Sequence, residues 1–295
     1  MTWDLEKKGT LAVIISTIIL GLNIFVIKIG EFYVPQLPLT SIALTVAGLI
    51  LLILNTSLRK EVDVFLETGY SLKFLWIGIV GTAIPFAMVI YGVNVSMVSN
   101  SFLLQVEVIF SMIFSHVLLK EKITKQQALL TVFTFLGVAL VVTDGIILSI
   151  SMGDILFLLA PVCFQAAHVV AKGVMKEVDS MVVTAYRLLI GGLTLIGISV
   201  LAGWNLLEFS KTYEGTILML YVIFASFIVN GLWYYGVKHI NLSKATSINI
   251  IYPLISTILA ILLLGEKLSY IKILGISLVF LCTLGLSRVK SVSRK

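Results

Sequence analysis

Charged residues are scarce in this chain of 295 residues. Asp, Glu, Lys and Arg make up 12% of it and hydrophobic residues 59%, whereas soluble domains carry about a quarter of their residues as charged side chains. A water-soluble fold of this length could not cover its surface with so few charges, but a surface that faces lipid needs none. The scarcity therefore predicts an integral membrane protein and leaves no room for a separate soluble domain.

Several kinds of site are excluded by other absences. The two cysteines, Cys163 and Cys282, lie in apolar segments, where a buried free thiol is the ordinary interpretation. The three histidines have no ligand partner at a useful spacing, so we expect neither a metal site nor a cofactor. No basic patch interleaved with aromatic residues accompanies the net charge of +6, so we expect no nucleic-acid partner. No phosphate-binding loop is present, which excludes an ATP-driven pump.

Long apolar runs are what the sequence does contain. Crossing a bilayer takes about 20 apolar residues per helix. Ten such segments are predicted, at residues 9–30, 38–56, 71–92, 97–119, 124–144, 151–174, 180–202, 214–236, 242–264 and 270–288. The expected fold class is therefore all-α integral membrane with ten transmembrane helices. Thr124 and Gln127 have the spacing of a capping box at the start of the fifth segment.

Lysine and arginine are unevenly divided between the two ends of these segments. With the N-terminus placed in the cytoplasm, sixteen of them fall at cytoplasmic ends and four at the opposite ends, while Arg187 lies inside a segment. Cytoplasmic loops of membrane proteins carry the excess of Lys and Arg. Both termini are therefore predicted to be cytoplasmic. The first apolar run lacks a small-residue cleavage site and is expected to act as an uncleaved anchor.

The two halves of the chain, residues 1–147 and 148–295, match each other. The segment LLKEKIT at 118–124 returns as LLGEKLS at 263–269, 145 residues later. Further pairs are 144 apart, namely Gly9 with Gly153, Lys28 with Lys172, Gly48 with Gly192, and Tyr91-Gly92 with Tyr235-Gly236. Five segments is an odd number, so the halves would cross the membrane in opposite directions. Such inverted repeats are typical of secondary transporters, with the substrate site near the membrane midplane.

These features together resemble the EamA branch of the drug/metabolite transporter superfamily. That family has a Glu-Pro pair in the fourth helix of each repeat and a GE-[KR]-[LI]-[ST] turn after it. Here the pair is divided, because Glu107 precedes Val108 and Pro253 follows Tyr252. The resemblance covers essentially the whole chain. It implies a multi-pass solute exporter or importer of the inner or plasma membrane. It also implies a cavity between helices 1–4 and 6–9, with helices 5 and 10 at the periphery.

Glu107 is the strongest candidate for function. It is the only acidic residue near the middle of an apolar segment, and an ionisable residue inside a membrane is costly unless it has a role. Burial favours the neutral form of the carboxyl, and a carboxyl so placed can bind either a proton or a cationic part of a substrate. The alternative is an interhelical hydrogen bond that only fixes packing.

Arg187 is the second charged candidate. It lies about two turns into the seventh segment, where the EamA family often has Arg, whereas the first repeat has Ala43. A guanidinium there could attract an anionic group such as a substrate carboxylate. It could instead reach the membrane interface or hold the end of a helix.

Uncharged polar and aromatic residues inside the segments complete the candidate set. The polar ones are Asn23, Gln105, Gln165, His168, Asn230 and Asn249, and the aromatic ones are Tyr91, Trp233, Tyr235 and Tyr252. The repeat relation between Tyr91 and Tyr235 favours these two, although packing alone could explain each member of the set. Pro85, Pro161 and Pro253 are predicted to kink their helices and to free a carbonyl about one turn earlier.

The sequence therefore predicts a secondary transporter that works by alternating access. Its expected partners are the lipid bilayer, protons as the coupling ion, and a small metabolite such as an amino acid, a related solute or a drug-like compound. A homodimer is left open. Two alternatives come from other classes. A membrane-embedded enzyme would need a catalytic cluster that the chain does not offer, and a receptor or scaffold has no feature in its favour.

Overall fold

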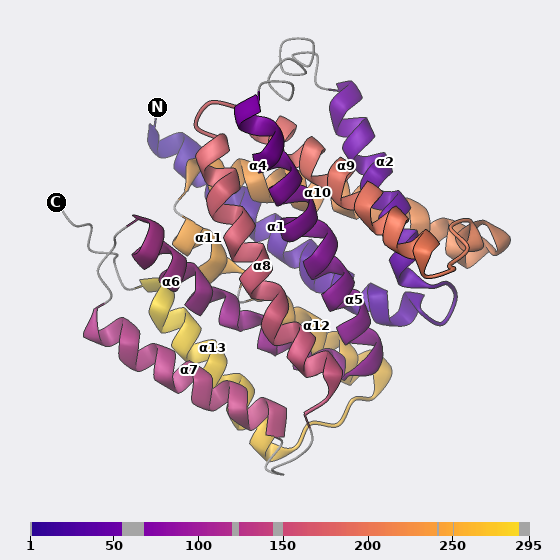
Figure 1. The fold of residues 1–295 in the computed structure, drawn as a ribbon. Helices are drawn as coiled ribbons and strands as arrows, with labels where there is room; N and C mark the ends of the chain where they lie inside the picture. The colour runs from indigo at the N-terminus through magenta and orange to yellow at the C-terminus, as the bar shows by residue number, and fades with distance from the viewer. Residues whose placement is uncertain are drawn as a thin grey trace.

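The computed structural model describes residues 2–54, 68–119, 124–143, 150–240, 242–249 and 251–288. Every regular element within these residues is helical, as Figure 1 shows. Seven helical stretches are long and apolar enough to cross a membrane, and two further apolar helices, Lys125–Val141 and Tyr270–Gly285, are shorter. The predicted all-α membrane class is thus confirmed for the described part of the chain.

The first half of the chain supplies eight elements. They are α1 (Thr2–Gly30), α2 (Gln36–Leu54), α4 (Thr68–Gly78), the π-helix η1 (Ile79–Ala83), α5 (Ile84–Val95), the 3₁₀ helix η2 (Val98–Val106), α6 (Glu107–Leu119) and α7 (Lys125–Thr143). The second half supplies α8 (Met152–Val174), α9 (Ser180–Leu201), the 3₁₀ helix η3 (Glu208–Lys211), α10 (Tyr213–His239), α11 (Leu242–Ile248), α12 (Ile251–Leu264) and α13 (Tyr270–Arg288). Each predicted segment coincides with one helix or with a run of consecutive ones.

The helix start predicted at Thr124 is confirmed in atomic detail. Thr124 N donates to Gln127 Oε1 at 2.8 Å, and Gln127 N donates to Thr124 Oγ1 at 3.2 Å. This reciprocal pair satisfies two of the amide groups that a helix N-terminus leaves without partners. A second capping box, from Ser151 and Asp154, opens α8. This second box was not predicted.

Three of the predicted helices are interrupted near their middle. The third segment changes from α4 through the π-helix η1 to α5. The fourth segment changes from η2 to α6 at Glu107, and the ninth from α11 to α12 just after Asn249. Pro85 and Pro253 lie in the first turns of α5 and α12, where proline is tolerated because those amides need no helical acceptor. Only Pro161 lies inside a helix that continues past it. Pro85 and Pro253 therefore lie where a new helix begins, and Pro161 lies in the interior of α8.

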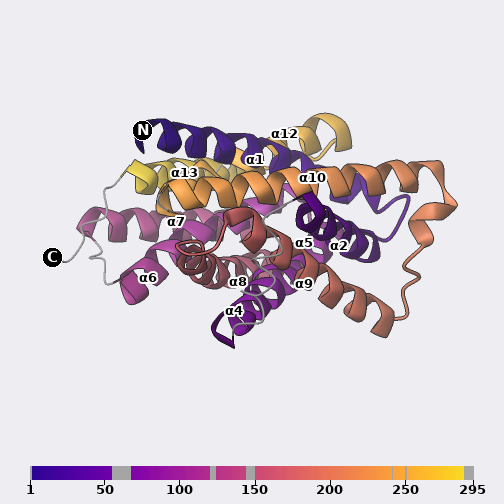
Figure 2. The ribbon, with the colours of Figure 1, turned by 90° about the horizontal axis from the view of Figure 1, so that it is seen from above.

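The helices pair in a way that repeats between the halves. The most extensive contacts are those of α2 with α9, α7 with α13, α1 with α10 and α5 with α8. A two-fold operation that exchanges the repeats maps the first two pairs onto themselves and exchanges the last two. Figure 1 shows α7 and α13 side by side at one edge of the bundle. The start of α1 and the end of α13 lie at the same end of the bundle in Figure 2.

The two repeat-related lysines perform the same task in each half. Lys28 Nζ donates to the carbonyls of Val93, Asn94 and Ser96 at 2.8, 3.2 and 3.3 Å. Lys172 Nζ donates to the carbonyls of Val237 and Ile240 at 2.9 and 2.7 Å. Both sets of carbonyls lie at helix C-termini, which lack internal donors and carry partial negative charge. The matching lysines are therefore helix caps.

The repeat-related glycines allow helices to approach closely. A Cβ atom added to Gly48 of α2 would lie 2.7 Å from the backbone nitrogen of Leu189, and one added to Gly192 of α9 would lie 2.6 Å from that of Thr45. Small residues at such crossings are how helices pack in lipid, where no hydrophobic force drives them together. The two repeat-related glycines thus lie at the same contact, where α2 crosses α9.

Candidate functional site

A cavity with a volume of about 130 Å³ for water-sized molecules lies between the two halves of the bundle. Its lining residues come from α1, α2, α5, η2, α6, α8, α9, α10, α12 and the residue after α11. Among the described residues α7 and α13 contribute none. This is the arrangement that the family resemblance implied, with the fifth helix of each repeat outside the cavity.

The cavity is not centred in the bundle. It reaches past Asn23 and Ile27 in the last third of α1, Thr40 at the start of α2, and Val222 in the first half of α10. These positions lie toward the end of the bundle that is opposite to the start of α1. The cavity therefore extends from the middle of the protein toward the end away from the two termini.

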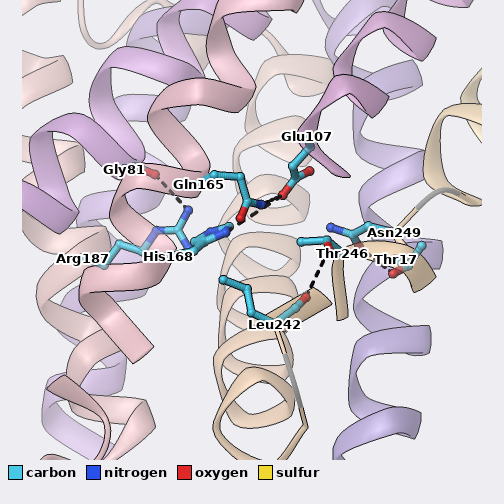
Figure 3. A network of polar contacts seen from close by, with 9 residues as sticks. All are labelled: Thr17, Gly81, Glu107, Gln165, His168, Arg187, Leu242, Thr246 and Asn249. Carbon is cyan, nitrogen blue, oxygen red and sulfur yellow. Dashed lines mark hydrogen bonds and ion pairs between the residues drawn. The ribbon is translucent and has the colours of Figure 1, made fainter. Parts of the chain in front are cut away.

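Glu107 lies at the inner part of this cavity, at the first residue of α6. Its side chain is 7% exposed. Gln165 Nε2 donates to Glu107 Oε1 at 2.5 Å, and His168 Nδ1 lies 4.0 Å from the same oxygen (Figure 3). A helix N-terminus favours negative charge, whereas the apolar surroundings favour the neutral acid. These opposing influences make a group whose charge depends on small changes around it.

Arg187 is held at the break in the third segment. Its Nη2 donates to the carbonyl of Gly81 at 3.0 Å, and its Nε donates to Thr82 Oγ1 at 2.8 Å. Pro85 has no amide proton to give to Gly81, four residues earlier, so the arginine supplies the missing donor. The guanidinium also lies 4.9 Å from the ring centroid of Tyr234, at cation–π distance.

These contacts bear on the interpretations of Arg187 that the sequence left open. The side chain is 3% exposed and lines the cavity, so it does not extend to the membrane interface. It does hold a helix break, as one interpretation proposed. Because it also borders the cavity, its charge is available to a solute.

A group of buried polar atoms near Glu107 has no hydrogen-bond partner among the described residues. The atoms are Gln165 Oε1, both ring nitrogens of His168, and Trp233 Nε1. The rings of His168 and Trp233 are in contact, with centroids 5.4 Å apart. Buried polar groups in native proteins nearly always have a partner. A bound solute or ordered water is therefore expected at this position.

The remaining polar candidates are linked to neighbouring helices. Thr17 Oγ1 donates to Asn249 Oδ1 at 2.7 Å (Figure 3), and Tyr221 OH donates to Asn23 Oδ1 at 2.8 Å. Asn230 Nδ2 donates to the carbonyl of Ser226 at 2.9 Å on its own helix. These hydrogen bonds fix amide groups on the cavity wall.

Most of the residues predicted from the sequence meet at the cavity. Its lining includes Asn23, Glu107, His168, Arg187, Asn230, Trp233, Asn249 and Tyr252. Gln105 and Gln165 are buried beside it, where Gln105 Nε2 lies 3.5 Å from the carbonyl of Asn249. Neither of these glutamines lines it.

The structure places Tyr91 and Tyr235 away from the cavity, which corrects the expectation that they line a pocket. Tyr91 is 55% exposed, and the half-buried Tyr235 packs on His239 with ring centroids 4.7 Å apart. Their neighbours Gly92 and Gly236 face the partner helices α8 and α1. Successive residues of a helix point about 100° apart, so the tyrosines face elsewhere. In each repeat it is the glycine after the tyrosine, and not the tyrosine itself, that makes the equivalent helix contact.

Several lining or supporting residues were not predicted. Ser16, Thr40 and Ser226 line the cavity, and Thr82 holds Arg187. Short hydroxyl residues are common in apolar helices and carry no sequence signal of their own. Pro85 did indicate a freed carbonyl one turn earlier, but not which side chain would bind it.

Metal ligands do not gather in the described residues: no group of three or more His, Cys, Asp or Glu side chains is placed to hold an ion. The two cysteines are free, with Cys163 half-buried and Cys282 buried.

Comparisons with known proteins agree on one family. The model of the EamA-like transporter family matches residues 7–143 and again residues 151–288. An uncharacterized transporter of Bacillus subtilis, YyaM, is 27% identical over 228 residues, which are 74% of each chain. An uncharacterized transporter of Clostridium kluyveri is 26% identical over 71% of this chain and 70% of its own. A WAT1-related chloroplastic protein of Arabidopsis thaliana is 30% identical over 48% of this chain and 35% of its own.

The fold also occurs among solved structures. One, titled only as the crystal structure of a protein, has a TM-score of 0.66 over 95% of this chain and 96% of its own, at 15% identity. An identity this low supports the fold and no more. The two matches to one family model fall on the two halves that the sequence pairs relate.

Proposed function

The chain belongs to the EamA-like transporter family, and on that premise we propose that it is a secondary transporter that moves a small metabolite across a cell membrane by alternating access. The solute is an amino acid, a related small molecule or a drug-like compound. The observation that carries the proposal is the cavity between the two halves, which Glu107, His168 and Arg187 line. A transporter needs such a site where its repeats meet.

The cavity's position supports a particular state. Under the proposed topology, the end of the bundle that carries the start of α1 is cytoplasmic, and the cavity extends toward the opposite face. The described conformation would then be outward-facing. Rocking of residues 1–147 against residues 148–295 about the central site would give the inward-facing state. Ten spans follow if η2 with α6, α7 and α13 each cross the membrane with the seven longer stretches.

Proton coupling is assigned to Glu107 within this proposal. It is the acidic residue of the described cavity lining, and it faces His168 of α8, Arg187 of α9 and Tyr252 of α12. A carboxyl can be charged while water reaches it and neutral while the bundle reorients, because a neutral group crosses a dry barrier at lower cost.

Solute flux tests the function directly. Purified protein should first be screened against a metabolite library for compounds that raise its melting temperature, because a ligand of the folded state alone stabilises it. Proteoliposomes that contain only this protein should then exchange the stabilising compound across the membrane unchanged, at a rate well above empty liposomes. Binding without any flux would favour a receptor, and conversion of the compound would favour a membrane enzyme.

Labelling of single cysteines tests the topology. In a variant without Cys163 and Cys282, a cysteine at Trp204, in the connection before η3, should react with an impermeant maleimide from outside only. A cysteine at Arg59, which lies outside the described residues, should react from the cytoplasmic side only. The reason is the sixteen-to-four distribution of Lys and Arg. Reaction of both positions from one face would mean that the number of spans between them is wrong.

A further inference from the structure

Six repeat-related pairs of residues line the cavity with both of their members. The offset is 144 residues in the first three segments of each repeat and 145 in the fourth. The members from the first repeat are Leu20, Ile24, Phe86, Val89, Leu104 and Glu107. Their counterparts from the second repeat are Phe164, His168, Asn230, Trp233, Asn249 and Tyr252. Where both members of a pair line the cavity, the cavity surrounds the two-fold axis that relates the repeats. We call these twelve residues the central site.

The two walls of the central site match in position but not in chemistry. Five of the six residues from the first repeat have no polar side-chain atom, and the exception is Glu107. Five of the six from the second repeat do carry a polar atom, and the exception is Phe164. The central site therefore has an apolar wall, from the first repeat, and a polar wall, from the second.

The polar wall has hydrogen-bonding capacity that no described residue uses. His168 and Trp233 are 4% and 5% exposed, and neither the imidazole nitrogens nor Trp233 Nε1 has a hydrogen-bond partner among the described residues. The carboxyl oxygen Glu107 Oε1 lies 4.0 Å from His168 Nδ1. An indole N–H can only donate, whereas a neutral imidazole donates with one nitrogen and accepts with the other. A solute that satisfies this wall must carry an acceptor for Trp233. It can also carry a donor for the carboxyl of Glu107, whose Oε1 lies at this distance from the imidazole.

The charges around the cavity limit the charge of the solute. Arg187 and Glu107 are the charged residues of its described lining. Their formal charges cancel, and Arg187 already donates to Gly81 and Thr82. A polyanion would find no further cation here, and an isolated charge in such a site is costly without a partner. A net-neutral head suits these walls.

We infer that the central site binds a net-neutral amphipathic solute in one orientation. Its polar head lies against His168, Trp233 and Glu107, and its apolar body lies against Leu20, Ile24 and Val89. This inference names the solute class of the site and rests on the proposed function for its meaning, but binding alone can test it.

Three probes that share one alkyl chain provide the test. Norleucine has both an amino and a carboxylate group, hexanoate has the same chain without the amino group, and pentylamine has it without the carboxylate. Equilibrium binding to the purified full-length protein should be about tenfold or more tighter for norleucine than for either relative, since each loses a hydrogen bond to a charged group. Affinity should also rise about fourfold per methylene from 2-aminobutyrate to norleucine as apolar surface is buried.

Two variants test which side chains contact the polar head of the solute and which contact its apolar body. Trp233→Phe keeps the ring and removes the donor, so it should reduce the preference for norleucine over pentylamine about tenfold. Ile24→Asn should flatten the dependence on chain length and leave that preference in place. Tyr91→Phe, outside the cavity, is the matched control and should change neither quantity.

Equal affinity for the three probes, no saturable binding of any of them, or a chain-length dependence that survives Ile24→Asn would overturn the inference. Selective binding of norleucine in a protein that moves no solute across proteoliposomes would leave the inference in place and overturn the proposed transport function. Flux of a different solute together with no preference for norleucine would overturn the inference and leave the proposed transport function in place.

Discussion

Replacing Glu107 with Gln should abolish solute accumulation driven by a pH gradient. The amide keeps the size of the side chain, and its oxygen can still accept from Gln165, which now lies 2.5 Å from Glu107 Oε1. It cannot take up or release a proton. In proteoliposomes with an imposed pH difference, the ratio of inside to outside solute should fall to one, while exchange of labelled for unlabelled solute persists. Both quantities come from one uptake experiment.

A matched control shows whether the effect is specific to Glu107 or follows from the removal of any carboxylate. Glu208 of η3 lies at the surface in an ion pair with Lys211, so Glu208→Gln should keep full accumulation. If Glu107→Gln still concentrates solute under the pH difference, the carboxyl is a packing group and coupling lies elsewhere. Loss of exchange as well as accumulation would show that solute binding itself requires the Glu107 carboxyl, and would leave proton coupling through Glu107 without support.

Replacing Arg187 with Gln should weaken solute binding about tenfold or more and also lower the melting temperature. The first effect is expected because the guanidinium is the positive charge of the described cavity lining, and hydrogen bonds to charged groups contribute about 1.5–3 kcal/mol. The second is expected because the carbonyl of Gly81 would lose its donor at a site where Pro85 cannot replace it. Calorimetric binding and thermal unfolding measure the two effects separately.

Arg187→Lys and Thr82→Val separate charge from structure. Lysine keeps the charge but lacks the planar fork that contacts Gly81 and Thr82 together, so Arg187→Lys should lower the melting temperature and retain most of the affinity. Thr82→Val removes one acceptor of the arginine and leaves its charge in place. Should all three variants lose stability to the same extent while affinity per folded molecule stays unchanged, Arg187 acts only in holding the helix break.

The fold was largely predictable because membrane helices carry their own signal. Each needs its backbone hydrogen bonds satisfied within the segment, so hydropathy and loop length locate it without reference to its neighbours. The same holds for the capping box of Thr124 and Gln127, whose partners are three residues apart. The break at Glu107 was not predicted, because it depends on neighbouring helices and the cavity that they enclose. The break near Asn249 was indicated by Pro253, one turn later in the chain.

The repeat spacing correctly identified positions that are structurally equivalent in the two halves, but it did not show whether those positions line the cavity. It paired Lys28 with Lys172 and Gly48 with Gly192, and the structure gives each pair one shared task. It also paired Tyr91 with Tyr235, which lie away from the cavity. Equivalent positions in two repeats share surroundings, but whether those surroundings are cavity, lipid or a neighbouring helix is set by packing.

The sequence by itself determined the membrane class, the two related halves, and Glu107 as the acidic group of the interior. The membrane class follows from composition and apolar runs, the two halves follow from residues repeated 144 or 145 positions later, and Glu107 stands out as an acid in an apolar run. Only the tertiary structure decided that Arg187 is held by the carbonyl freed at Pro85, and that His168 and Trp233 face the cavity with unused hydrogen-bonding atoms. Those facts depend on residues 58 or more positions apart meeting at helix crossings. No local pattern encodes which side of a helix will meet which neighbour.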